Sequence, residues 1–304
     1  MDGATITAEP ASDPRNSRRV WAIAGAVILG LLLVAFIVWR LVGGGDLQRL
    51  AGAPDATIAA GTARVAVVAT VEDVPIVERF TLTVAEGEAE LAEQRAHLRR
   101  EMPGLGNIPL LNRLLPEAVE LLHDGRDTYV RLPVDGQRSW VRLSEAENDA
   151  AAGPGTTAPG LTNPVAALAL LHVLDGMPEV RGQETVRGQP STRFRVLVDL
   201  DRAVDALSGR ARDVAVALRQ LRGSNRLPMD VWLDADDRVT RLRYMVRPEL
   251  RGVGPITVTS DLELYDFGTD VDIRTPSPAE IVQVPADRLR GLDLLDWLRD
   301  LLDR

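Results

Sequence analysis

The sequence contains no cysteine and no lysine, and all 35 basic residues among its 304 are arginine. Without cysteine the chain can form no disulfide and carry no lipid-modified N-terminal cysteine, which suits an oxidising compartment. The arginine usage accompanies an abundance of alanine, valine, leucine and glycine, and indicates GC-rich coding rather than guanidinium chemistry. Acidic residues outnumber basic ones and give a net charge of -9, so the sequence predicts no nucleic-acid partner.

Residues that carry chemistry are also scarce. The three histidines, His97, His123 and His172, include no pair at metal-ligand spacing, and neither a G-x-S-x-G nucleophile elbow nor a phosphate-binding loop is present. The acidic cluster Asp234–Asp237 lacks the glycine and the terminal glutamate of a calcium loop, and a hairpin turn explains it better. We therefore predict no enzyme, no metal site and no cofactor.

Charge is absent from one long run, Val20–Trp39. A helix of that length rises about 30 Å, the thickness of the hydrocarbon core of a bilayer, and Trp21 and Trp39 lie where indole rings favour the interface. A buried core helix would keep a polar side, and a signal peptide would have an apolar region about half as long. We predict an uncleaved transmembrane helix over residues 20–42.

The charges and the chain length on either side of this run predict its orientation. Arg15, Arg18 and Arg19 precede it and the long remainder follows it, so we expect the N-terminus in the cytoplasm and the main domain outside the cytoplasm. Residues 1–19 are polar, and we expect a disordered tail. Residues 43–60 are rich in glycine and alanine, and we expect a flexible tether with a reach of about 25 Å.

Strand patterns dominate residues 61–284. Apolar and polar residues alternate around Phe80 and Leu82 and again from Ile256 to Leu264, which predicts strands with one buried face. Asp124-Gly125 and Asp135-Gly136 lie between apolar runs and predict hairpins. Further strands are expected at Ala63–Val71, Glu179–Val186, Thr192–Val198, Met229–Leu233, Val239–Val246 and Val271–Arg274.

Two helical regions are expected inside this domain. Asn163 can cap a helix that starts at Pro164 and extends to about residue 174. An aspartate at position 199 or 201 can cap a second region that reaches about Leu221, with a break near Gly209.

Two further segments complete the prediction. Glu86–Glu101 has helix-forming composition but lies among strands, so it fits a helix or a long exposed strand. Residues 285–304 carry a wide apolar face opposite acidic residues, which predicts an amphipathic helix that packs on its own domain or docks an envelope protein through Leu292–Leu302. Together the patterns predict an α+β fold with a mainly antiparallel sheet.

The order of the motifs along the chain resembles the order in a known protein family. The hairpin text DGRDTYVRLPVDGQRSWVRL comes first, then Asn163-Pro164, then VRGQETVRGQPSTRFRVLVDLDRA, LPMDVWLDADDRVTRLRY and LELYDFGTDVDIRTP. This succession resembles, over roughly Gly61–Val284, the actinobacterial envelope lipoproteins of the LprG/LppX type, which have a LolA-like fold. The chain departs from them in having a predicted membrane helix in place of the lipidated cysteine.

The resemblance implies a curved antiparallel sheet, a half-barrel closed by helices, with a hydrophobic cavity that binds the acyl chains of lipids or lipoglycans. The residues that it places along such a cavity are Phe80, Leu82, Leu168, Leu171, Phe194, Val196, Val258 and Leu262. We therefore expect a membrane-anchored, extracytoplasmic protein that holds or transfers acyl chains. The alternative is an interaction or sensory module that docks a partner through its C-terminal amphipathic helix.

Overall fold

The computed structural model describes residues 45–283, except for 75–76, 102–117, 126, 135–136, 144–162, 223 and 251–253. The chain divides into two units, Met1–Asp46 and Leu47–Arg304, and the architecture described here is that of the second unit. The predicted cytoplasmic tail, transmembrane helix and C-terminal amphipathic helix lie outside the described residues. Within the described part of the chain, no helix has both the length and the apolar character needed to cross a membrane.

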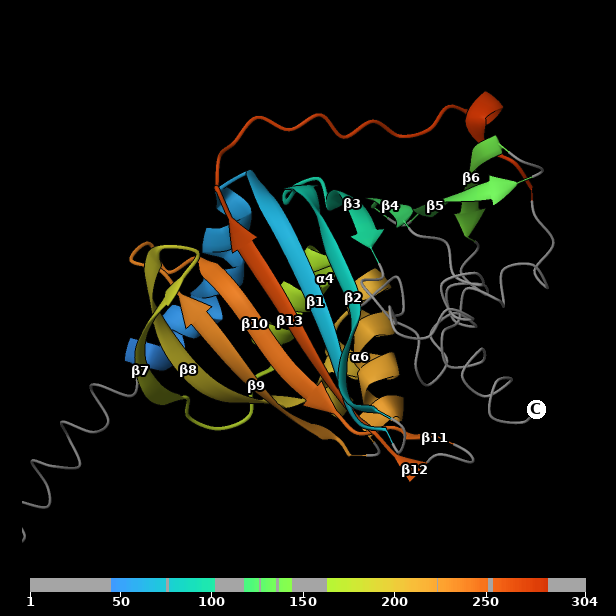
Figure 1. Ribbon diagram of the computed structural model, residues 1–304. Helices are drawn as coiled ribbons and strands as arrows, with labels where there is room; N and C mark the ends of the chain where they lie inside the picture. The colour runs from blue at the N-terminus through green and yellow to red at the C-terminus, as the bar shows by residue number, and fades with distance from the viewer. Residues whose placement is uncertain are drawn as a thin grey trace, which may run out of the picture. The chain divides into compact units, whose positions relative to one another are not determined.

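Eleven strands form one sheet in the order β6-β5-β4-β3-β2-β1-β13-β10-β9-β8-β7 (Figure 1). The strands are β1 Thr62–Val74, β2 Val77–Glu90, β3 Arg95–Glu101, β4 Ala118–Asp124, β5 Asp127–Val134, β6 Gln137–Leu143, β7 Glu179–Val186, β8 Gln189–Asp199, β9 Arg226–Leu233, β10 Val239–Val246 and β13 Thr257–Tyr265. A separate two-stranded ladder joins β11 (Glu249–Leu250) to β12 (Gly254–Pro255). The end strands β6 and β7 do not pair with each other, so the large sheet is not closed.

Strand β1 joins the two halves of the sheet. It pairs antiparallel with β2 on one side and with β13 on the other, so that Val67 lies opposite both Ala85 and Leu262. Every other pairing in this sheet is also antiparallel. Since side chains alternate between the two faces of a strand, these three partners all face the same side of the sheet, where all three are buried. The predicted antiparallel sheet is confirmed.

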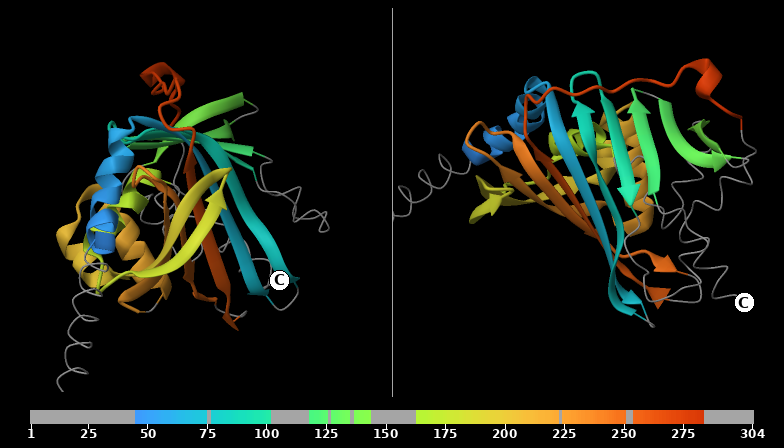
Figure 2. Two further views of the ribbon diagram at one scale, coloured as in Figure 1. Left: turned by 90° about the vertical axis from the view of Figure 1, so that its left-hand side faces the viewer. Right: turned by 45° about the horizontal axis from the view of Figure 1, so that its top comes forward.

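Helices cover that inner face (Figure 2). They are α4 (Pro164–Ala169), the 3-10 turn η2 (Leu170–Val173), α5 (Leu200–Ala206) and α6 (Gly209–Arg222). The amide oxygen of Asn163 accepts hydrogen bonds of 3.1 Å from the N–H groups of Val165 and Ala166, which confirms the predicted cap. Asp199 caps α5 in the same way, through the N–H of Arg202.

The predicted break near Gly209 is also present. Gly209 has a φ of 56° at the start of α6, a conformation that a residue with a Cβ adopts only at a cost. It allows the chain to reverse between α5 and α6, which pack against each other on the inner face.

Residues 45–59 form a helix where the composition predicted a flexible tether, so that prediction is wrong for this segment. Leu50 and Ala53 are fully buried, as is the hydroxyl-bearing side chain of Thr57. Their spacing of three and four residues places them on one face of a helix. Because alanine and glycine are frequent among the neighbouring residues, this short apolar face does not stand out in the composition.

Two other segments differ from a simple reading of the sequence. Glu86–Glu101 is strand β2, a turn and strand β3, so the strand interpretation holds because cross-strand pairing outweighs helix propensity. Val271–Arg274 was predicted as an edge strand, but it forms no ladder and belongs to an extended segment, residues 269–283, that is interrupted by the 3-10 turn η3 (Pro278–Glu280). That prediction is wrong, because Ile273 is buried against Leu122 and Tyr129 on the outer face rather than within a sheet.

Candidate functional site

One apolar cluster fills the space between the inner face of the sheet and the helices. Strands contribute Val65, Val67, Leu98, Val130, Val231 and Leu242, and helices contribute Leu168, Leu200 and Leu218, among others. The helix over residues 45–59 adds Leu50 and Ala53 to the same cluster. Side chains from both ends of the described chain therefore meet in a single interior.

Most of the predicted lining residues lie in this interior. Leu168 in α4, Leu171 in η2, Phe194 and Val196 in β8, and Leu262 in β13 are all buried members of the cluster. Val258 in β13 is half-buried and packs against it. Phe80 and Leu82 belong to β2, and their side chains lie outside the described part of the structure.

The enclosure of these side chains is uneven. Leu168 and Phe194 have no surface accessible to water, so neither borders a space that admits a water molecule. An acyl chain that contacts them must therefore displace other side chains or part the helices from the sheet. Val258 is the least enclosed of the predicted lining residues that the structure describes, and it lies opposite Val71 of β1 and Val246 of β10.

The sequence reasoning missed several members of the cluster. Val231 lies directly opposite Phe194, and Leu242 lies opposite Leu262, so both share the inner face with predicted lining residues. Both residues alternate with outward-facing ones, Asp230, Trp232 and Arg243, and this alternation is the sequence pattern that would have identified them. Leu50 and Ala53 were missed because their segment was taken for a tether.

Polar side chains are also buried among these apolar ones. His123 in β4 lies 3.2 Å from the Thr128 hydroxyl through Nδ1. Burial, reinforced by the charge of Arg210, lowers the pKa of His123 to about 3, so its ring is neutral at physiological pH. Burial raises the pKa of Tyr244, which bonds to Ser260 on the neighbouring strand. These pairs satisfy polar groups that would otherwise destabilise an apolar interior.

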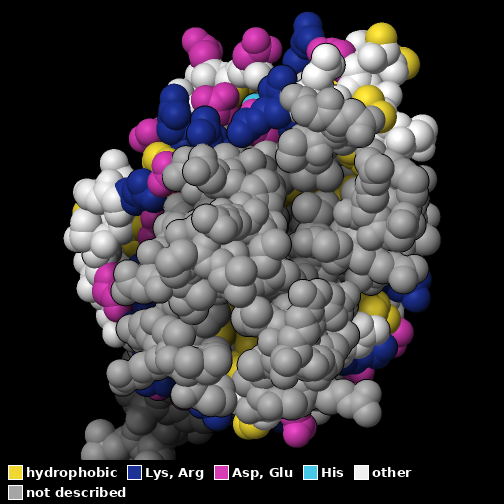
Figure 3. Space-filling view, turned by 45° about the vertical axis from the view of Figure 1, so that its right-hand side comes forward, with side chains coloured by type: hydrophobic (Ala, Val, Ile, Leu, Met, Phe, Trp, Pro, Cys, Tyr) yellow, Lys and Arg dark blue, Asp and Glu magenta, His cyan; other side chains and the backbone are white. Residues whose placement is uncertain are grey.

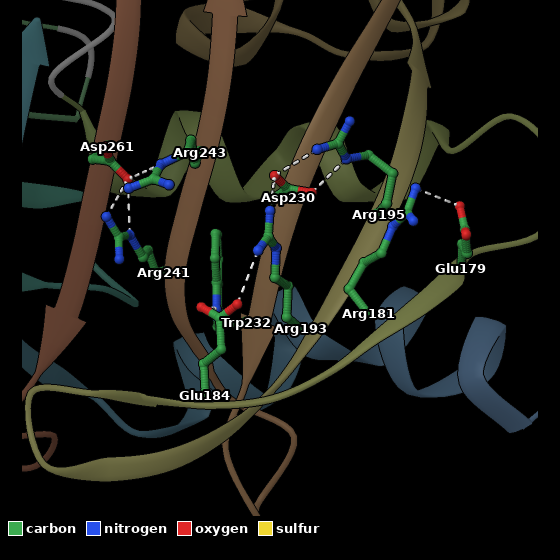
Figure 4. A network of polar contacts seen from close by, with 10 residues as sticks. All are labelled: Glu179, Arg181, Glu184, Arg193, Arg195, Asp230, Trp232, Arg241, Arg243 and Asp261. Carbon is green, nitrogen blue, oxygen red and sulfur yellow. Dashed lines mark hydrogen bonds and ion pairs between the residues drawn. The ribbon is translucent and has the colours of Figure 1, made fainter.

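The opposite face of the sheet carries charged residues instead (Figure 4). At its centre Trp232 has no exposed surface, because the guanidinium groups of Arg193, Arg241 and Arg243 lie 5.1, 5.1 and 5.8 Å from its ring centre. Its indole N–H donates a 2.9 Å hydrogen bond to Glu184. Arginine over an aromatic face is attracted by the ring quadrupole and covers its apolar surface.

Carboxylates pair with these arginines. Asp230 is 7% exposed at its side chain and accepts hydrogen bonds from Arg193 and Arg195, each with an Nη2 distance of 2.9 Å. Burial alone would raise the pKa of Asp230, but the bonds from Arg195 and Arg193 outweigh it, so the pKa is lowered. Asp261 accepts bonds from Arg241 and Arg243 in the same manner. The paired charges thus lie on this face, and the apolar cluster lies on the inner face.

A second charged cluster lies on strands β3 to β6. Glu120 is within ion-pair distance of Arg131 and Arg138, at 3.2 and 4.0 Å, and Arg131 lies 5.7 Å from the ring centre of Trp140. Figure 3 shows acidic and basic side chains side by side along this part of the surface. The backbone N–H of Val282 donates to the Trp140 carbonyl at 2.8 Å, so the extended segment pairs with the β6 edge.

In the described ranges, no three histidine or acidic side chains come together in a group that could hold a metal ion.

Comparison with known proteins gives structural neighbours only. No protein-family model matches the sequence, and no curated protein matches it significantly. LprF from Mycobacterium bovis is similar in structure with 17% identity and a TM-score of 0.43, over 77% of this chain and 98% of LprF. The lipoprotein LppX from Mycobacterium tuberculosis has 14% identity and a TM-score of 0.43, over 75% of this chain and 97% of LppX.

A putative outer membrane lipoprotein-sorting protein domain from Vibrio parahaemolyticus is a more distant neighbour, with 9% identity and a TM-score of 0.33, over 74% of this chain and 93% of that domain.

Proposed function

We propose that the chain is a membrane-anchored, extracytoplasmic protein that holds or transfers the acyl chains of lipids or lipoglycans between its sheet and its helices. One observation carries this proposal. Five side chains that the sequence resemblance assigned to a lipid cavity, from α4, η2, β8 and β13, meet in one apolar cluster on the inner face. Among the described residues, the outer face carries mainly paired charges and one small apolar cluster around Ile273.

The interior has suitable chemistry for such a ligand. Each methylene group that leaves water contributes about 0.8 kcal/mol, so one ordinary acyl chain supplies roughly 10 kcal/mol before ordering costs. Since Leu168 and Phe194 are already enclosed, part of that energy is used to replace contacts between the helices and the sheet. The short helices α4 and α5, with 6 and 7 residues, can shift without breaking the ladders of the sheet.

The predicted anchor sets where this binding takes place. A lipid-modified protein can leave its membrane, whereas a helix that spans the bilayer cannot easily do so. The chain has no cysteine for lipid modification, and the uncharged run Val20–Trp39 takes its place in the proposal. We therefore propose that lipid is received or presented at the membrane in which the protein is embedded.

The test uses the chain from residue 45 onward, so that the buried helix residues Leu50 and Ala53 are retained. After purification without added lipid, the bound lipids are extracted and identified by mass spectrometry, and the uptake of a fluorescent fatty acid is measured. We expect co-purified lipid in stoichiometric amount or saturable uptake. A folded protein that carries no lipid and takes up no fatty acid would refute the proposal.

A further inference from the structure

The N-terminal helix fixes the point at which the chain enters the domain. The Arg49 Nε donates a 2.7 Å hydrogen bond to Asp237 in the β9–β10 turn, and the Thr57 hydroxyl accepts one of 2.8 Å from the N–H of Val239. Between them, Leu50 and Ala53 are fully buried. Residues 47–59 are thus a rigid part of the domain rather than a free connection to it.

This entry point lies at the β7 end of the sheet. The Arg49 guanidinium is 5.6 Å from the ring centre of Phe194 in β8, and Phe194 is the cross-strand partner of Val180 in β7. Figures 1 and 2 show the beginning of β7 beside the beginning of the helix over residues 45–59. The edge strand and the chain entry therefore share one end of the domain.

Apolar side chains are exposed at the same end. Met177, just before β7, is 47% exposed and Val180 is 48% exposed. They are two of four large hydrophobic residues with high exposure among the described residues. The other two lie elsewhere, Met245 on β10 in the middle of the sheet and Val282 beside the opposite edge strand β6.

Chain length limits which end can lie at the membrane. Residues 43–46 connect the end of the predicted transmembrane helix, residues 20–42, to Leu47, and fully extended they reach at most about 18 Å. The large sheet has ten steps from β7 to β6, each of about 4.8 Å along the sheet, so the β6 edge lies roughly 48 Å further along the strand order. The β7 end, where the chain enters, is therefore within reach of the bilayer surface, and β6 is the strand furthest from it in the strand order.

We propose that the β7 end of the domain, through Met177 and Val180, docks onto the lipid surface of the membrane that holds the anchor. The partner is the bilayer interface, into which both side chains insert. Tethering raises the effective concentration of this surface, so that two apolar side chains suffice for a contact that would be weak for a free domain. The inference rests on the anchor of the proposed function, but not on lipid carriage.

The absence of native cysteine gives a direct test in the full chain. The variants Met177→Cys, Val180→Cys and Val282→Cys are each labelled with an environment-sensitive fluorophore and reconstituted in phosphatidylcholine–phosphatidylglycerol nanodiscs that contain lipids with a shallow nitroxide quencher. Val282, at 37% exposure, is the matched apolar position at the far edge. We expect at least twofold stronger quenching at positions 177 and 180 than at 282.

The same preparations separate this inference from the anchor. Alkaline extraction of membranes that carry each variant shows whether the chain is integral. If the chain is integral and the three labels are quenched equally, the docking surface is refuted while the anchor stands. If the chain is extracted, the anchor of the proposed function is refuted, and the docking inference with it.

Discussion

The backbone N–H of Val239 donates a hydrogen bond of 2.8 Å to the hydroxyl of Thr57, which lies 182 positions earlier in the chain. The same hydroxyl donates to the carbonyl of Ala53 at 2.6 Å. One side chain thus satisfies a strand donor and holds the N-terminal helix against the β9–β10 hairpin. This bond explains why a segment of tether-like composition is ordered.

Removal of that hydroxyl should destabilise the domain. We expect Thr57→Val to lower the free energy of unfolding by about 1–3 kcal/mol, because the buried N–H of Val239 loses its acceptor. Thr57→Ser keeps the hydroxyl and should cost less than about 1.5 kcal/mol. Urea unfolding followed by near-ultraviolet circular dichroism measures both. Equal losses in the two variants would show that the methyl group, not the hydrogen bond, matters.

The buried His123 predicts a dependence of stability on pH. Its pKa is lowered from 6.5 to about 3, so between these values the unfolded chain binds a proton that the folded chain does not. The contribution of the neutral His123 ring to the free energy of unfolding is therefore fully present above pH 6.5. It falls as the pH is lowered towards 3, with a loss of about 2 kcal/mol at pH 5.

Two histidine variants isolate this effect. His123→Gln should reduce the difference between the unfolding free energies at pH 7.5 and pH 5, whereas His172→Gln, at an exposed position, should leave it unchanged. An unaltered pH dependence in His123→Gln would place the titrating group elsewhere.

The Asp230 carboxylate should contribute more to the free energy of unfolding than a surface carboxylate does. Asp230→Asn leaves Arg193 and Arg195 without their shared anion, and we expect a loss of about 2–4 kcal/mol. The control is Asp236→Asn, where a 72% exposed side chain pairs with Arg238, with an expected loss below about 1 kcal/mol. Chemical denaturation at pH 7 and low salt compares the two. Similar losses would mean that the Asp230 network adds little to stability.

Gly87 is required by the close approach of β2 and β3. A Cβ atom built at this position would lie 1.9 Å from the carbonyl oxygen of His97, which is backbone and cannot rotate away. We expect Gly87→Ala to cost more than about 3 kcal/mol or to prevent folding. Gly52→Ala has nothing within 4 Å of the new Cβ and should be neutral or stabilising by up to about 1 kcal/mol. Thermal unfolding of both variants checks this contrast.

Val258 gives a test of acyl-chain uptake that does not require disruption of the most enclosed side chains. It is half-buried on the inner face of β13, and Val258→Trp should fill the space beside it and lower the uptake of a fluorescent fatty acid severalfold. Thr259→Trp adds the same side chain to the opposite face of the same strand and should leave uptake unchanged. Equal uptake by both variants would mean that acyl chains do not pass Val258.

Much of the local structure could be predicted from short patterns. Asn163 followed by Pro164 identified the start of α4 because one cap determines one helix end. The turn at Asp124-Gly125 joins β4 to β5 as expected, and the strand predicted at Glu179–Val186 matches β7 in its bounds. These features depend on residues that are neighbours in the chain.

Other features depend on contacts that no local pattern contains. The register that places Val231 opposite Phe194 fixes which side chains share the interior, and alternation alone gives only the face. The N-terminal helix could not be predicted from composition because three buried side chains and two long-range hydrogen bonds hold it. The extended segment around Ile273 reads as a strand until its buried contact with Leu122 is known.

The position of β1 at the centre of the sheet has a consequence for biogenesis. Val67 and Leu262 are cross-strand partners although nearly 200 positions separate them, so loop closure opposes their pairing until both strands are available. The hairpins on either side of β1 can form while the chain is still being synthesised, but the sheet cannot be completed before β13 has followed. We expect incomplete chains to depend on protection from proteolysis and self-association until the last strand of the sheet is available.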